Sequence, residues 1–262
     1  MKIATWNVNS IRVRQPHVIE WLNNNYVDAL CLQETKVVDE NFPKNTFEKL
    51  GYYVYVYGQK AYNGVAILSR YPLENVNIGF TSIVKDSLVE EFDKQKRIIT
   101  GILNGVRIIN LYVPNGASIG SEKYNYKLRW LKVLKRYLTE ILDQPNHGLC
   151  VCGDFNIALE DKDIYDSKSK DNHIMSSQLE REALKDILSL GLKDVFRKFI
   201  SEGNYFSWWD YRASGFKHNR GWRIDHQYLT PELYRKALSC TIDIEPRKLV
   251  RPSDHAPVIV EF

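Results

Sequence analysis

Short apolar runs of five to eight residues recur along this 262-residue chain and limit its fold more than any other feature. Most are rich in β-branched and aromatic side chains, a composition typical of buried β-strands. The runs lie at 2–8, 29–33, 53–58, 64–69, 97–103, 106–113, 148–153, 223–229 and 256–262. A chain with so many short strands must pair them into sheets, and their number indicates two packed sheets rather than one.

Helical patterns separate some of these runs. We predict helices over 17–25, over 122–143, where leucine and isoleucine recur at three- and four-residue steps, and over 177–190, where Gly191 stops the pattern. Strands and helices intermix along the whole length, and there is no linker-like or repetitive stretch. We therefore expect one α/β domain over 1–262, with the helices outside the two sheets.

Composition limits the partners and the compartment. A net charge of +4 permits a polyanionic partner without requiring one. The four cysteines lie mostly inside apolar runs and lack the spacing of a zinc site, so we interpret them as reduced core residues. The sequence shows no signal-peptide pattern and no apolar run of membrane-spanning length. We expect a cytoplasmic protein that makes no membrane contact.

The stretch VCGDFN, residues 151–156, ends an apolar run with Asp154 and Asn156, two groups that are costly to desolvate. Alone, a turn would explain it. Five other runs, however, carry polar groups at or near one end: Asn7 with Asn9, Gln33 with Glu34, Tyr112 with Asn115, Asp225 beside Arg223, and Asp254 with His255. Because side chains from distant strands converge at the ends of α/β sheets, the repetition predicts one shared site.

The chemistry of these residues suits phosphate ester hydrolysis. Glu34, Asn7 and Asp254 offer the hard oxygen ligands that Mg²⁺ accepts. The chain has no nucleotide-binding GxxxxGK[ST] loop. A His255 paired with Asp225 would favour its charged form and stabilise a phosphate that gains charge in the transition state. With Asp154 orienting or deprotonating water, the residues predict metal-assisted hydrolysis of a phosphoester.

An aromatic and basic stretch indicates which phosphoester. Between residues 207 and 225 three tryptophans are interleaved with cations: Trp208, Trp209 and Trp222 with Arg212, Lys217, Arg220 and Arg223. Aromatic rings beside cations suit nucleic acid, because rings stack on bases or sugars while cations meet phosphates. The alternative is an aromatic core with solvated basic flanks, and for Trp209 alone we favour the core.

Eight motifs in register carry a family resemblance: WNVNSIR, LQETK, NGVAILS, LYVPNG, GDFN, SWWDYR, NRGWRID and PSDHAPV. Together, over residues 3–258, the chain resembles the exonuclease III family of apurinic/apyrimidinic endonucleases, within the endonuclease/exonuclease/phosphatase superfamily. The resemblance implies a four-layered α/β sandwich of two packed mixed sheets flanked by helices. It also implies a monomeric, Mg²⁺-dependent DNA repair enzyme, with Mn²⁺ able to substitute. Its substrate would be double-stranded DNA with abasic sites or blocked 3′ ends, cut 5′ to the abasic site to leave a 3′-hydroxyl.

The resemblance also assigns roles, motif by motif. Glu34 would be the principal metal ligand, in a ligand set completed by Asn7, Asp154, Asn156, Asp254 and His255. Asp154 would position the water, with Asn156 and Tyr112 at the phosphate and Asp225 paired to His255. Positions expected at the DNA are Arg97, Asn115, Lys127 and Asn219, and those expected around an extruded baseless sugar are Trp208, Trp222 and Ile224. The number of metal ions remains open, as does whether Asp154 or the Asp225–His255 pair is the base.

Two departures and two alternatives accompany this interpretation. His226 and Gln227 stand where an apolar strand is expected, and residues 166–182 match the family only loosely, as a surface loop that could tune endonuclease against exonuclease activity. A phosphatase or RNA nuclease on the same scaffold is the first alternative. The second, a DNA-binding module with a decayed site, is disfavoured because the polar residues named above are intact.

Overall fold

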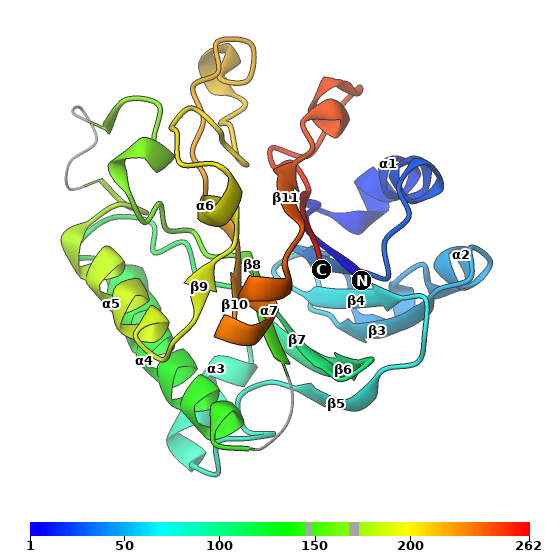
Figure 1. The fold of residues 1–262 in the computed structure, drawn as a ribbon, viewed down its shortest axis with the longest axis horizontal. Coiled ribbons are helices and arrows are strands. Elements are labelled where there is room, and N and C mark those ends of the chain that lie inside the picture. The colour runs from blue at the N-terminus through cyan, green and yellow to red at the C-terminus, as the bar shows by residue number, and fades with distance from the viewer. Residues whose placement is uncertain (145–147, 168–172) are drawn as a thin grey trace.

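Two six-stranded β-sheets form the centre of the computed structural model, which describes residues 1–144, 148–167 and 173–262 (Figure 1). The first sheet has the order β11 (Ser239–Ile242), β12 (Val258–Glu261), β1 (Lys2–Asn7), β2 (Ala29–Gln33), β4 (Val65–Ser69) and β3 (Tyr53–Tyr57). The second has the order β5 (Glu74–Ile78), β6 (Ile98–Leu103), β7 (Val106–Tyr112), β8 (Gly148–Asp154), β10 (Asp225–Leu229) and β9 (Lys193–Asp194). All nine predicted runs form strands.

The α-helices are α1 (Ile11–Asn24), α2 (Lys44–Glu48), α3 (Glu90–Asp93), α4 (Glu122–Leu142), α5 (Gln178–Leu188), α6 (Phe196–Phe199) and α7 (Pro231–Lys236). The three predicted helices are confirmed as α1, α4 and α5. The first begins at Ile11 rather than at residue 17, because the segment before His17 is too rich in arginine to show an apolar period. A capping box between Ser177 and Glu180 fixes the start of α5.

Three apolar clusters define four layers, as predicted. One cluster lies between the two sheets and contains buried residues from both, such as Ile67 and Ile108. A second joins the outer face of the first sheet to α1, where Trp6 packs against Trp21. The third joins the outer face of the second sheet to α4 and α5. Figure 1 shows α4 and α5 side by side against the second sheet.

Amide side chains join the two sheets near their centre. Gln33 of β2 donates to Asn110 of β7 at 2.7 Å, and Asn110 donates to two carbonyls of the first sheet, at 2.8 and 3.0 Å. Gln227 reaches the carbonyl of Val258 at 2.9 Å. Gln227 and His226 are wholly buried, so the polar residues that departed from an apolar strand serve packing and not DNA contact. These directional hydrogen bonds favour one relative placement of the sheets, although the side-chain oxygens of Gln33 and Gln227 are buried without a partner.

Candidate active site

The sheet topology brings the polar strand ends together. β1 and β2 are parallel, with Asn7 beside Gln33, so Glu34 follows at the same edge. In the second sheet β7 and β8 are also parallel, which sets Tyr112 beside Asp154. β10 runs antiparallel to β8 and begins with Asp225 opposite Asp154. Parallel strands have their carboxyl ends at one edge, and that edge carries the site.

The backbone leaves these strands in conformations that most residues avoid. Glu34 and Asn156 have φ values of 50° and 49°, in the left-handed region. Gly153 has a φ of 143°, and a Cβ there would lie 1.9 Å from the carbonyl oxygen of Leu111. Strained backbone at several strand ends is typical of functional sites.

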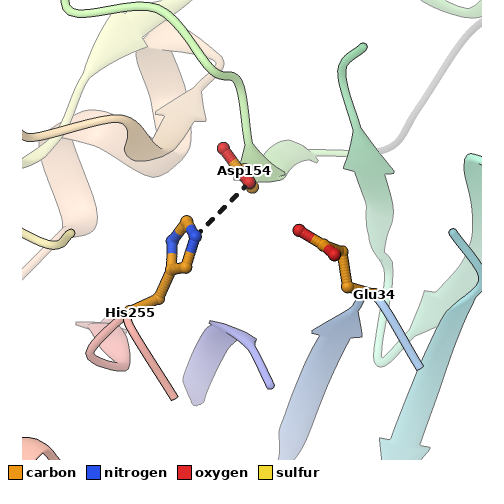
Figure 2. A group of neighbouring side chains, drawn as sticks. All are labelled: Glu34, Asp154 and His255. Atoms are coloured by element: carbon orange, nitrogen blue, oxygen red, sulfur yellow. Dashed lines mark ion pairs between the residues drawn. The ribbon is translucent and has the colours of Figure 1, made fainter. Parts of the chain in front are cut away.

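Three side chains converge at the centre of this edge. Ligand atoms of Glu34, Asp154 and His255 all lie within 4.8 Å of one another, and Figure 2 shows the three pointing toward a common space. Asn7 donates through Nδ2 to Glu34 Oε1 and to Asp154 Oδ2, each at 2.9 Å. Its own oxygen accepts from the backbone N–H of Asn9. Asn7 thus braces the two carboxylates, and its oxygen does not face them as the predicted ligand role would require.

His255 is held between two carboxylates. Its Nδ1 lies 2.9 Å from Asp225 Oδ2, which also accepts from Ser207 at 2.6 Å, and its Nε2 lies 3.8 Å from Asp154 Oδ2. Burial alone would lower the pKa of His255, but Asp225 and Asp154 outweigh it and raise that pKa to about 10. The predicted Asp225–His255 pair is therefore present, and an imidazolium suits a phosphate contact better than metal ligation.

The pKa values of the two carboxyl groups are shifted in opposite directions. Burial raises the pKa of Asp154 to about 7, against the opposing pull of His255. Burial also acts on Glu34, but Lys36 and the amide of Asn7 outweigh it, so the pKa of Glu34 is lowered. The buried Asp154 and the half-buried Glu34 share one amide donor, and the hard oxygens of the two carboxylates fit a divalent cation such as Mg²⁺. Asp254, predicted as a ligand, lies outside this group of three.

The phosphate side of the site is built on two asparagines. The backbone N–H of Asn156 donates to Asp154 Oδ1 at 2.9 Å, and its side chain donates to the carbonyl of Val113 at 3.0 Å. Asn115 donates to Asn156 Oδ1 at 3.0 Å. Two of the predicted phosphate-binding amides therefore form one unit beside Asp154.

Lys127 requires a correction, since we expected it at DNA phosphates. It is fully buried, ion-paired with Glu180, and donates to the carbonyls of Asn156 and Asn115 at 2.7 and 3.3 Å. A buried ammonium cannot meet a phosphate from solvent. Lys127 instead supports the two asparagines from behind, which its place on the inner face of α4 explains.

Arg97 and Tyr112 form one wall of a hollow of about 560 Å³ beside the site. The Arg97 guanidinium lies 4.5 Å from the centre of the Tyr112 ring and donates to the Tyr112 carbonyl at 3.1 Å. Burial and the nearby Glu34 hold the pKa of Tyr112 well above its usual value. Its phenol is therefore a neutral hydrogen-bond donor.

A second hollow of about 580 Å³ opens on the other side and is walled by Trp208, Trp222 and Asn115. Ile224 packs with Trp222 beneath it. The sequence did not single out His173, yet it lines this hollow with its ring centre 5.5 Å from that of Trp222. Its only signal was its position in the loosely matching segment 166–182, of which residues 168–172 lie outside the described residues.

The aromatic and basic stretch divides into wall and core. Trp209 is buried, as expected, and donates to Asn219, which is exposed. We expected Arg223 among the cations that face phosphate. That prediction is wrong, because Arg223 is buried and paired with Asp163 and Asp194 at 2.7 Å each. Adjacent residues in this irregular stretch point to opposite sides, which sequence spacing does not reveal.

Comparison with known proteins agrees with this geometry. The Endonuclease/Exonuclease/phosphatase family model matches residues 4–255. Exodeoxyribonuclease III of Haemophilus influenzae is 35% identical, with both chains fully covered. The 3′ phosphatase NExo from Neisseria, solved bound to a product DNA hairpin, has a TM-score of 0.94 and 39% identity, over 100% of this chain and 99% of that one. An AP endonuclease from Archaeoglobus fulgidus has a TM-score of 0.92 and 40% identity over the same shares.

The chain therefore belongs to the Endonuclease/Exonuclease/phosphatase family. Within it the full-length matches place the chain among the nucleases of the exonuclease III type, so the resemblance carried by the eight motifs is confirmed. In the part of the chain that the structure describes, no helix is both long and apolar enough to cross a membrane.

Proposed function

We propose that the protein is a Mg²⁺-dependent AP endonuclease of base excision repair that acts as a monomer on double-stranded DNA. It would hydrolyse the phosphodiester 5′ to an abasic site and leave a 3′-hydroxyl, with 3′–5′ exonuclease and 3′-phosphatase or phosphodiesterase activity at strand ends. The observation that carries this proposal is the convergence of Glu34, Asp154 and His255 at one edge of the sheets. Their neighbours Tyr112 and Trp208 line two adjoining hollows of about 560 and 580 Å³.

Glu34 and Asp154 would hold Mg²⁺, which supplies positive charge to the phosphate and to a water nucleophile. The other steps belong to the chain. The imidazolium of His255 and the amide of Asn156 would bind the phosphoryl oxygens, and the neutral phenol of Tyr112 would donate to the same group. Such preorganised donors strengthen as charge develops, and they need no reorganisation during the reaction.

Asp154 would orient or deprotonate the attacking water. Both of its oxygens are fixed, one by the backbone N–H of Asn156 at 2.9 Å and the other by Asn7 at 2.9 Å. The carboxylate is therefore held in one orientation before any substrate arrives. The alternative base, the Asp225–His255 pair, is disfavoured, because an imidazolium that donates to the phosphate has no lone pair with which to accept a proton.

Incubation with Mg²⁺ and a duplex that contains one tetrahydrofuran abasic analogue tests the proposal. Incision 5′ to the analogue is expected, and an Asp154→Asn variant is the control. Absence of incision above that control would reject an AP endonuclease. Faster hydrolysis of RNA or of phosphoinositides would favour a different phosphoesterase on the same scaffold.

One observation favours 3′-end processing as the main activity. The His173 ring stands in the hollow that an extruded sugar would enter and lies against Trp222. A 3′-terminal phosphate reaches the site from a strand end, so it needs no extrusion into that hollow. The relatives named above include both a 3′ phosphatase and an AP endonuclease. Rates on a 3′-phosphate duplex and on the abasic duplex, measured side by side, decide between the two.

A further inference from the structure

A row of four polar contacts connects the acidic site to the wall of the sugar hollow. We propose that this row, the Glu34–Trp208 belt, links cation occupancy at Glu34 to the placement of the Trp208 indole. Its intermediate members are Lys36, Asn9 and Asp254, which would be positioning residues for the hollow. The inference rests on the proposed function, because it needs a cation at Glu34.

The contacts are short and consecutive. Lys36 Nζ lies 2.7 Å from Glu34 Oε2 and donates to Asn9 Oδ1 at 2.6 Å. Asn9 Nδ2 then donates to Asp254 Oδ1 at 2.9 Å. Trp208 Nε1 donates to the other oxygen of Asp254 at 3.0 Å. The Asn9 amide therefore binds its two neighbours in the belt through different atoms, and so does the Asp254 carboxylate.

The backbone is arranged to make these contacts. Asn9 and Lys36 both have positive φ, 43° and 55°, although neither is a glycine. A lysine in the left-handed region is strained and persists only where surrounding contacts hold it. The backbone N–H of Lys36 donates to the carbonyl of Asn63 at 2.9 Å, and in this conformation the Lys36 ammonium reaches both Glu34 and Asn9.

The two ends of the belt face different tasks. Glu34 is one of the candidate cation ligands, while the Trp208 side chain walls the hollow. The Trp208 backbone is fixed, because its N–H and its carbonyl both pair with Trp222, at 2.9 and 2.8 Å. Movement at this wall is therefore left to the indole, whose N–H is held by Asp254.

A divalent cation bound to Glu34 competes with the Lys36 ammonium for the same carboxylate. A weaker Lys36–Glu34 contact alters the hydrogen bond from Lys36 to Asn9. The change then reaches the Trp208 indole through the Asn9–Asp254 and Asp254–Trp208 hydrogen bonds. Binding of cation and shaping of the hollow are then one linked equilibrium. In this scheme the position of the Trp208 wall changes when the cation binds, because the contacts that hold the indole are then altered.

The test uses the six indole N–H resonances of the protein in a ¹H–¹⁵N spectrum, recorded without DNA. Mg²⁺ is titrated in, its binding is measured separately by calorimetry, and Trp208→Phe assigns the relevant peak. We expect the Trp208 peak to shift and to saturate with the calorimetric Mg²⁺ affinity. Lys36→Met and Asn9→Ala should abolish most of that shift, while Lys49→Met, which removes an exposed lysine elsewhere, should leave it unchanged.

A Trp208 peak that stays fixed while calorimetry shows Mg²⁺ binding would overturn the inference. An equal shift in Lys36→Met and in Lys49→Met would do the same, because the movement would not pass through the belt. The five other indole peaks report whether each variant is folded. If calorimetry finds no Mg²⁺ binding, the proposed cation site is rejected, and with it the inference, because no cation then binds at Glu34.

Discussion

Replacement of Lys127 by methionine distinguishes its buried structural role from the contact with DNA phosphate that the family resemblance implies. In the structure the Lys127–Glu180 pair is completely shielded from solvent. Lys127→Met keeps the length of the side chain and leaves the Glu180 carboxylate buried without its cation. Breaking a buried ion pair in this way costs about 3–5 kcal/mol, a large part of the roughly 5–15 kcal/mol that holds a typical domain together.

Urea denaturation measures this loss, and Lys132→Met is the matched control. Lys132 is exposed on the same helix α4, and its replacement should change the free energy of unfolding by less than about 0.5 kcal/mol. The double variant Lys127→Met/Glu180→Gln removes the stranded charge and should recover part of the stability. Cleavage should fall in Lys127→Met, because the carbonyls of Asn115 and Asn156 lose their common donor.

DNA affinity measured over a salt series supplies the refuting result. Removing one cation that touches a phosphate of duplex DNA reduces the slope of log K against log salt by about 0.9. The buried position of Lys127 predicts an unchanged slope. A slope reduced by that amount, together with a stability loss below about 1 kcal/mol, would show that Lys127 reaches DNA and that its buried placement is wrong.

Three further outcomes are expected. Asp163 has a pKa lowered to about 2 from 3.8, because Arg223 outweighs its burial, so its stabilising contribution is complete above pH 4 and disappears as the pH falls toward 2. The stability gap between wild type and Asp163→Asn should therefore narrow over that range in acid denaturation, and a constant gap would contradict the assignment. His173→Gly should raise abasic incision relative to 3′-phosphate removal by roughly tenfold, the effect of one badly fitting group in a pocket, and an unchanged ratio would show that His173 does not restrict the hollow. The four cysteines are buried free thiols, so a thiol reagent should label them only at the rate of unfolding, and fast labelling of the native protein would contradict their burial.

Much of the fold could be predicted because its elements are locally encoded. The run at 148–153 is continuously apolar and that at 106–113 is interrupted only by Arg107 and Asn110, as expected of strands buried on both faces, and the two runs form β8 and β7. The strands that sequence reasoning missed are polar or short. β5 has the sequence ENVNI and is half exposed, while β9 and β11 have two and four residues. Such edge strands adopt the extended conformation because they pair with a neighbouring strand, and no local sequence pattern predicts that pairing.

The site could be predicted as a set but not in its internal contacts. Polar groups at strand ends indicate Asn7, Glu34, Asp154 and His255, and the topology does bring them together. The helical period of α4 places Lys127 in line with the buried Trp130 and Leu131, but we assigned it to DNA phosphates from the family resemblance, and no local pattern shows the partner that its burial needs. A buried lysine depends on a partner such as Glu180, 53 residues away.

The pairing of β12 with β1 has a consequence for the time at which activity can appear. Val258 of β12 pairs with Thr5 of β1, and this contact lies directly behind His255 and Asn7. A growing chain that has already folded its second sheet still lacks the imidazolium and the strand that closes the first sheet. Contacts of such long range form late, so the site stays incomplete until β12 has paired with β1.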